Sequence, residues 1–196
     1  MKLIKALFCV FMVISQIGCN SDTVKEKRGT SYRSFEGRYE QALDDLKEAK
    51  TEKDRFLVLS ELAMMSFELG KVSNAQKYAE EVLKMAQNYE SNWNYGNVIH
   101  KGNIVLGRIA AKNNDINEAI KYLLRAGNTK GSPQLDSFGP NMSLAKTLLE
   151  KNERKAVVKY LEACRKFWKM DRDRLDFWIF QIERGKIPEF GANMVY

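Results

Sequence analysis

The chain has 196 residues, of which 44% are hydrophobic and only three are proline, and its 32 basic and 25 acidic side chains give a formal net charge of +7. This composition is too apolar for an intrinsically disordered chain, and three cysteines are too few for a disulfide scaffold. A structural zinc site would need every cysteine and the single histidine in one place, so we expect no metal site.

The first eighteen residues have the pattern of an export signal. Lys2 and Lys5 precede an apolar run from Ala6 to Ile14, which is too short to span a bilayer as a helix. Gly18 stands directly before Cys19. This placement resembles the lipobox of bacterial lipoproteins, in which the cysteine becomes the acylated first residue of the mature protein. The resemblance predicts a lipoprotein signal peptide at 1–18 and a palmitate-type lipid anchor at Cys19.

Two alternatives to acylation remain open at this end of the chain. Gln16 departs from the lipobox, where an aliphatic residue is usual, and an ordinary cleaved signal or a buried structural cysteine would also fit. Under the lipoprotein hypothesis the protein is exported and held in the cell envelope, on the outer membrane facing the periplasm if the host has two membranes. The polar stretch 19–34 is then a flexible tether, and Cys164 is the one cysteine left in the folded body.

The charge is unevenly distributed along the chain. Removing Lys2 and Lys5 lowers +7 to +5, residues 36–90 carry 8 basic and 12 acidic side chains, and residues 150–186 carry 11 and 7. Mixed charges along helices are typical of a solvated surface, and an exported protein meets little nucleic acid. We therefore expect no nucleic-acid partner.

The body of the chain repeats a turn followed by a helix. Within each copy, an alanine lies five positions after the turn position and begins a stripe of small and apolar residues. The alanines at 42, 75, 119 and 156 are spaced by 33, 44 and 37 residues. Helical apolar spacing also precedes two of the turns, at Arg55–Leu69 and Val98–Lys112. The unit is a helical hairpin, and its copies should stack because one hairpin cannot bury its own apolar face.

This unit resembles the tetratricopeptide repeat (TPR), a helix–turn–helix of 34 residues. The matching positions are Gly70, Ala75, Ala79 and Val82 in one copy and Leu106, Gly107, Ala119, Leu123 and Ala126 in the next. The resemblance implies an all-α, TPR-like helical-hairpin solenoid over 35–196, with about three and a half repeats. An irregular helical bundle is the alternative. The stretch from Asn103 to Trp168 also resembles a set of bacterial repeat proteins, which supports this architecture and adds no activity.

The longer spacings and the C-terminal end give further expectations. The extra residues should lie in Gln87–Gly96 and in a connecting loop at 127–140, with Pro140 starting the next helix. An apolar pattern from Leu175 to Ile182 stops before a glycine and a proline, which predicts a capping helix. The final residues should lie back over that cap.

The TPR resemblance also implies a binding groove, because the first helices of TPR hairpins line a concave surface. The predicted groove combines an apolar floor with a basic strip, suited to an extended or acidic peptide. Its residues are Ser60, Met64, Phe67, His100, Lys101, Ile104, Arg108, Lys112 and Asn141, with Ala145 beside them. For His100, the alternative is a hydrogen-bond network between helices rather than a patch that faces a ligand.

No motif in the chain indicates catalysis. Cys164 lies mid-helix on an apolar stripe, and the Ser/Asp-containing stretch 131–140 lacks a base. No phosphate-binding loop or dinucleotide fingerprint is present, so we expect no cofactor. The sequence therefore predicts a non-catalytic adaptor that binds an envelope protein or peptide, of unknown oligomeric state. The alternative is an enzyme or accessory subunit acting on cell-wall or surface polysaccharide.

Overall fold

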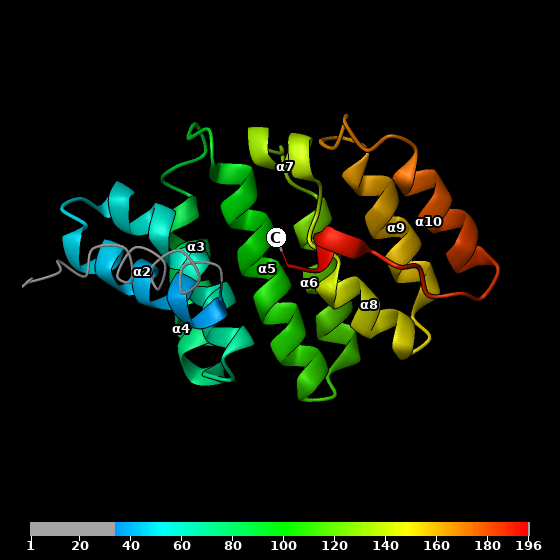
Figure 1. The fold of residues 1–196 in the computed structure, drawn as a ribbon, viewed down its shortest axis with the longest axis horizontal. Helices are drawn as coiled ribbons and strands as arrows, with labels where there is room; N and C mark the ends of the chain where they lie inside the picture. The colour runs from blue at the N-terminus through cyan, green and yellow to red at the C-terminus, as the bar shows by residue number, and fades with distance from the viewer. Residues whose placement is uncertain (1–33, 196) are drawn as a thin grey trace, which may run out of the picture.

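The computed structural model describes residues 34–195, which form a row of helices that runs from α2 at the left to α10 at the right in Figure 1. The predicted signal peptide, the lipid attachment at Cys19 and nearly all of the predicted tether lie outside these residues. Ser34, the last residue of the predicted tether, belongs to the folded part, since its side chain accepts a hydrogen bond from the Gly37 N–H at 3.0 Å and caps the first helix.

Residues 34–195 contain α-helices and one short 3₁₀ helix, with no strand among them. The helices are α2 (Phe35–Glu48), α3 (Glu52–Glu68), α4 (Val72–Ala86), α5 (Tyr95–Lys112), α6 (Ile116–Gly127), α7 (Pro133–Phe138), α8 (Ser143–Glu150), α9 (Arg154–Cys164), α10 (Arg174–Glu183) and the 3₁₀ helix η1 (Gly191–Met194). Within this part of the chain, none of the helices combines the length and hydropathy needed to cross a membrane.

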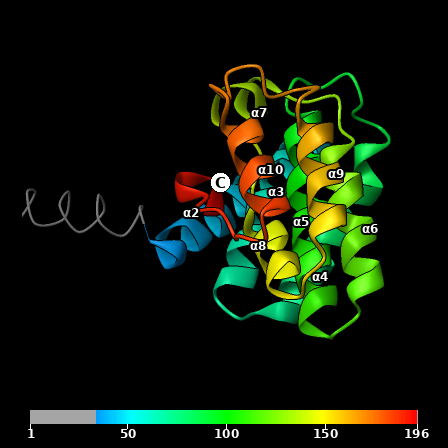
Figure 2. The ribbon, with the colours of Figure 1, turned by 90° about the vertical axis from the view of Figure 1, so that its right-hand side faces the viewer.

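The helices pair into three antiparallel hairpins, α3–α4, α5–α6 and α8–α9, with α2 before them and α10 after them (Figure 1). Central α5 packs against α3, α4, α6 and α8. In Figure 2, α4 and α6 lie toward one side of the molecule and α2 and the C-terminal 3₁₀ segment toward the other. This arrangement confirms the predicted solenoid of about three and a half repeats.

A left-handed residue ends the first helix of each hairpin. Gly70, Asn114 and Asn152 have φ values of 71°, 63° and 67°, and the residue after each donates its N–H to a carbonyl five positions earlier at 2.8–2.9 Å. Glycine and asparagine adopt this conformation at least cost, which explains these residue types at this place. In the third hairpin the turn residue is Asn152, so the repeat begins one residue later than the sequence pattern indicated.

That shift changes which residues are equivalent in the last repeat. Val157, fully buried, takes the position of Ala75 and Ala119, whereas Ala156 lies one place earlier and is more exposed. Seven residues further on, Cys164 takes the position of Val82 and Ala126. The thiol is therefore a small packing group, as predicted, and burial raises its pKa.

Close packing between hairpins depends on Gly107. A Cβ added there would lie 2.3 Å from Leu144 Cδ2 in α8 and 3.0 Å from Tyr122 Cβ in α6. Any side chain at this position would have to displace the Leu144 side chain and press on Tyr122. The glycine that resembled the TPR pattern therefore sets the approach of one hairpin to the next.

The connection between the second and third hairpins differs from the expected loop. Ser132 caps α7, Pro133 lies in its first turn, and α8 begins only at Ser143, so Pro140 does not start a helix. Proline is favoured in the first turn because the missing N–H has no helical partner there. Long spacings in the repeat thus have two causes, the bends after α4 and the extra helix α7.

The C-terminal segment packs on the capping helix α10 and also on the α7–α8 connection. Phe190 packs edge-on against Trp178 of α10, with ring centroids 5.0 Å apart, as expected. Beyond it, buried Asn193 donates from Nδ2 to the carbonyls of Phe138 and Pro140 at 2.9 and 3.0 Å, and its own carbonyl accepts the Met142 N–H at 2.7 Å. The chain end therefore holds the α7–α8 connection in place.

Candidate functional site

Most residues of the predicted groove do not reach the surface. Ser60, Met64, His100, Ile104 and Asn141 are each no more than 2% exposed, and Ala145 is buried as well. They lie in the packed interior between neighbouring elements of the solenoid. The expectation of an open groove lined by these side chains is therefore wrong, because the hairpins approach too closely to leave them accessible.

His100 connects α5 through hydrogen bonds to α6 and to the segment that leads into α8. Its Nδ1 lies 3.0 Å from the Ala126 carbonyl, and its Nε2 accepts the Asn141 N–H at 2.9 Å. This pairing defines a neutral ring protonated on Nδ1. The Tyr160 hydroxyl donates to the Asn141 carbonyl at 2.9 Å and extends the network to α9. Burial lowers the pKa of His100 to about 4, so the structure favours the network over a ligand-facing patch.

The predicted basic strip is largely neutralised by acidic residues of α3. Arg108 pairs with Glu68 and stacks over the Phe67 ring, with its guanidinium carbon 4.2 Å from the ring centroid. Lys101 donates to Glu61 at 2.8 Å, and only Lys112, near the end of α5, is exposed. These ion pairs fasten α5 to α3, so Lys101 and Arg108 do not form the unpaired basic strip that the sequence predicted.

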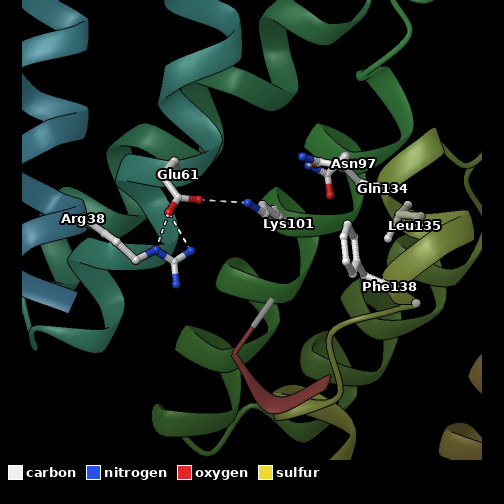
Figure 3. A pocket seen from close by; sticks show the side chains of 8 residues that line it. Arg38, Glu61, Asn97, Lys101, Gln134, Leu135 and Phe138 are labelled. Carbon is white, nitrogen blue, oxygen red and sulfur yellow. Dashed lines mark hydrogen bonds and ion pairs between the residues drawn. The ribbon is translucent and has the colours of Figure 1, made fainter. Parts of the chain in front are cut away.

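A cavity of about 350 Å³ remains open beside Lys101, between α2, α3, α5 and α7 (Figure 3). Its lining comes from four elements that are distant in sequence. The lining residues are Arg38, Glu61, Asn97, Lys101, Gln134, Leu135, Phe138 and Gly139. Of the groove residues predicted from the sequence, Lys101 is the one that lines this cavity.

Two cations share one carboxylate on one wall of the cavity. Glu61 Oε1 accepts hydrogen bonds from Arg38 Nε at 2.9 Å and Nη2 at 2.6 Å, while Glu61 Oε2 accepts the Lys101 hydrogen bond. Burial alone would raise the pKa of Glu61, but Lys101 and Arg38 together outweigh it and hold the pKa below its usual value. The group therefore carries a net charge of about +1 at neutral pH.

The opposite wall is apolar with one amide pair. Asn97 Nδ2 donates to Gln134 Oε1 at 2.6 Å, and Leu135 and Phe138 of α7 face the charged group across the cavity (Figure 3). Phe138 is 52% exposed, so its ring forms part of the rim. An excess cation opposite an apolar ring suits a segment that carries a carboxylate next to an apolar side chain.

Helix α7 is fixed over the cavity by close backbone packing. Gly139 has a φ of 86°, and a Cβ added there would lie 2.4 Å from Trp168 Cε2. Together with the Asn193 bonds to the Phe138 and Pro140 carbonyls, this contact holds the apolar wall from the far side. The cavity wall is thus set by the rigid fold and not by a free loop.

Residues 100–126, which cover the second part of α5 and all of α6 except its last residue, match the family model of the tetratricopeptide repeat. Together with the hairpin stacking, this match decides the architecture. The fold is a TPR-like helical solenoid. No curated protein and no solved structure matches the chain. TPR repeats generally mediate protein–protein interactions, so protein binding is the activity that this solenoid supports.

Sequence reasoning missed Arg38, Glu61 and the α7 side chains. Glu61 lies 40 residues from Lys101 and pairs with it only because α3 packs beside α5. No local spacing marks such a pair. The stretch 127–140, which contains α7, was expected to be a connecting loop and gave no reason to expect a cavity wall. The charge excess could be found only once the hairpins were placed side by side.

Proposed function

We propose that the protein is a non-catalytic adaptor that binds an extended, acidic segment of an envelope protein in the cavity beside Lys101. The observation that carries the proposal is the sharing of Glu61 by two cations. A carboxylate from a partner would complete the charge balance at Arg38 and Lys101, and a neighbouring apolar side chain would pack on Phe138.

The cavity is poorly suited to the alternative of polysaccharide cleavage. Glycoside hydrolysis requires two carboxylates that flank the scissile bond, and Glu61 is the only carboxylate in the lining. Its lowered pKa also keeps it from acting as a general acid near neutral pH.

The adjacent carboxylates at Asp44-Asp45 and Glu80-Glu81 do not supply a second site. Asp44 pairs with Lys47 and Asp45 with Gln41, while Glu80 pairs with Gln76 and Glu81 with Arg55. Neighbours in sequence thus point to different partners. Among residues 34–195, no cluster of His, Cys, Asp and Glu is arranged to hold a metal ion.

The proposal includes a lipid anchor at Cys19 that keeps the adaptor in the bacterial envelope. Its support is the order of basic, apolar and small residues up to Gly18-Cys19. Acyl chains contribute about 0.8 kcal/mol per buried CH₂, and two or more chains hold a protein on a bilayer stably.

Binding to a peptide library tests the cavity. Acidic peptides with one aromatic residue should bind more tightly than matched peptides in which Asp and Glu are replaced by Asn and Gln. Lys101→Gln should weaken binding about tenfold or more, whereas Lys112→Gln, which removes an exposed charge near the end of the same helix, should leave it unchanged. Equal binding of acidic and amide peptides, or equal effects of the two variants, would contradict the proposal.

A further inference from the structure

The outer face of α10 carries two exposed phenylalanines among charged side chains, and no other helix of residues 34–195 covers it. Of the seven large hydrophobic side chains that are exposed in this part of the chain, four lie on α10 or beside its ends. They are Met170, Phe177, Phe180 and Ile187, and the two phenylalanines are 57% and 50% exposed.

This face lies at the end of the row of helices. α10 buries Leu175, Trp178 and Ile182 toward α9, and its other side points away from the solenoid (Figure 1). A terminal repeat is expected to have a polar outer face, because no further repeat covers it. Exposed aromatic side chains surrounded by charged residues at this position are typical of an interface.

The charges on the same face are arranged so that α10 is complementary to α10 of a second copy in the opposite direction. Asp173 stands at the start of the helix and Arg184 at its end, and both are exposed. Within the described part of the chain, neither has an ion-pair partner, although Arg184 stacks over the Phe180 ring at 3.5 Å.

We propose that two copies of the chain associate through an antiparallel α10–α10 contact with two-fold symmetry. In such a pair the residue numbers of facing positions have a constant sum. The register that brings Phe177 against Phe180 of the second copy also brings Asp173 against its Arg184. Symmetry repeats each contact, so four phenylalanines pack between two Asp–Arg pairs. Antiparallel helix dipoles add to this complementarity.

The α10–α10 contact does not use the residues that line the cavity. The dimer would therefore leave the cavity of each copy accessible to partners. Two linked cavities would bind a partner with two acidic segments more tightly than one. The contact itself stands independently of the proposed function.

Charge reversal tests the register. The full chain would carry Cys19→Ala, so that a shared membrane or micelle cannot hold two copies together, and sedimentation velocity would be measured across a range of concentrations. Asp173→Arg and Arg184→Asp should each weaken self-association about tenfold, because each places like charges together twice. An equimolar mixture of the two variants should restore the dimer, since every mixed pair again joins Arg to Asp.

Phe177→Ser combined with Phe180→Ser should give a monomer at all concentrations. Trp93→Ser, which removes an equally exposed aromatic ring on another surface, should not change the sedimentation coefficient. Unchanged circular dichroism in each variant would show that the helices are intact. A parent chain that stays monomeric would overturn the proposal, and so would a mixture that fails to dimerise when its parent does.

Discussion

The buried histidine predicts a specific loss of stability on mild acidification. His100 is the single histidine of the chain, and burial lowers its pKa from 6.5 to about 4 in the folded state. In the unfolded chain the His100 imidazole is therefore protonated near pH 6.5, whereas in the folded chain it is protonated only near pH 4. Above pH 6.5 this group leaves stability unchanged, and stability falls as the pH decreases through the window between the two values.

The size of the effect follows from these two pKa values. Between pH 7 and pH 5 the free energy of unfolding should decrease by about 2 kcal/mol, and by about 3 kcal/mol once the pH reaches 4. Protonation of Nε2 would also place two hydrogen-bond donors opposite each other, because the Asn141 N–H donates to the neutral Nε2 at 2.9 Å. Few other groups titrate between pH 5 and 7, so the change belongs largely to one side chain.

Urea unfolding followed by circular dichroism at pH 7, 6 and 5 measures this dependence. The His100→Gln variant is less stable at every pH because it disturbs the network, but its stability should be nearly constant from pH 7 to 5. A parent protein without a decrease over this range, or a variant with the same decrease, would refute the assignment of a neutral buried imidazole.

Other predictions concern packing, the chain end and the anchor. Gly107→Ala should lower the free energy of unfolding by about 1–3 kcal/mol, because its Cβ would meet Leu144; an unchanged urea midpoint would contradict that contact. Asn193→Ala should lower the free energy of unfolding by about 1–2 kcal/mol and speed proteolysis of the C-terminal segment, since the Phe138 and Pro140 carbonyls lose their donor; equal cleavage rates would argue against that role. Cys164 should react with maleimide only in denaturant, and modification of the native thiol would disprove its burial. Cys19→Ala should release the protein from membranes, and continued sedimentation with membranes would count against acylation.

The repeat architecture was predictable because it depends on local rules. The turn residues Gly70 and Asn114 and the small residues after them follow from backbone conformation and helix packing, and the structure has the hairpins where these patterns place them. The last repeat shows the limit of such rules. Ala156 matched the expected spacing, but Asn152 forms the turn and moves the equivalent position to Val157.

The candidate site was predictable only in part, because it depends on how closely the hairpins approach. The sequence placed Lys101 correctly on the first helix of a hairpin. It could not show that Glu61 pairs with Lys101 and lowers the positive charge around it. It also treated Ser60 and Met64 as surface residues, whereas close packing buries them. Helix α7, which has no counterpart in the repeat, supplies the wall that turns this surface into a cavity.

Site-specific photocrosslinking in intact cells tests the central claim most directly. A photoreactive residue at Phe138, on the rim of the cavity, should capture a defined envelope protein through an acidic segment, and Lys101→Gln in the same chain should greatly reduce that product. The same residue at Lys77, exposed on α4, should not capture it. Crosslinks of equal yield at both positions, or a Phe138 product that is unaffected by Lys101→Gln, would contradict partner binding in the cavity.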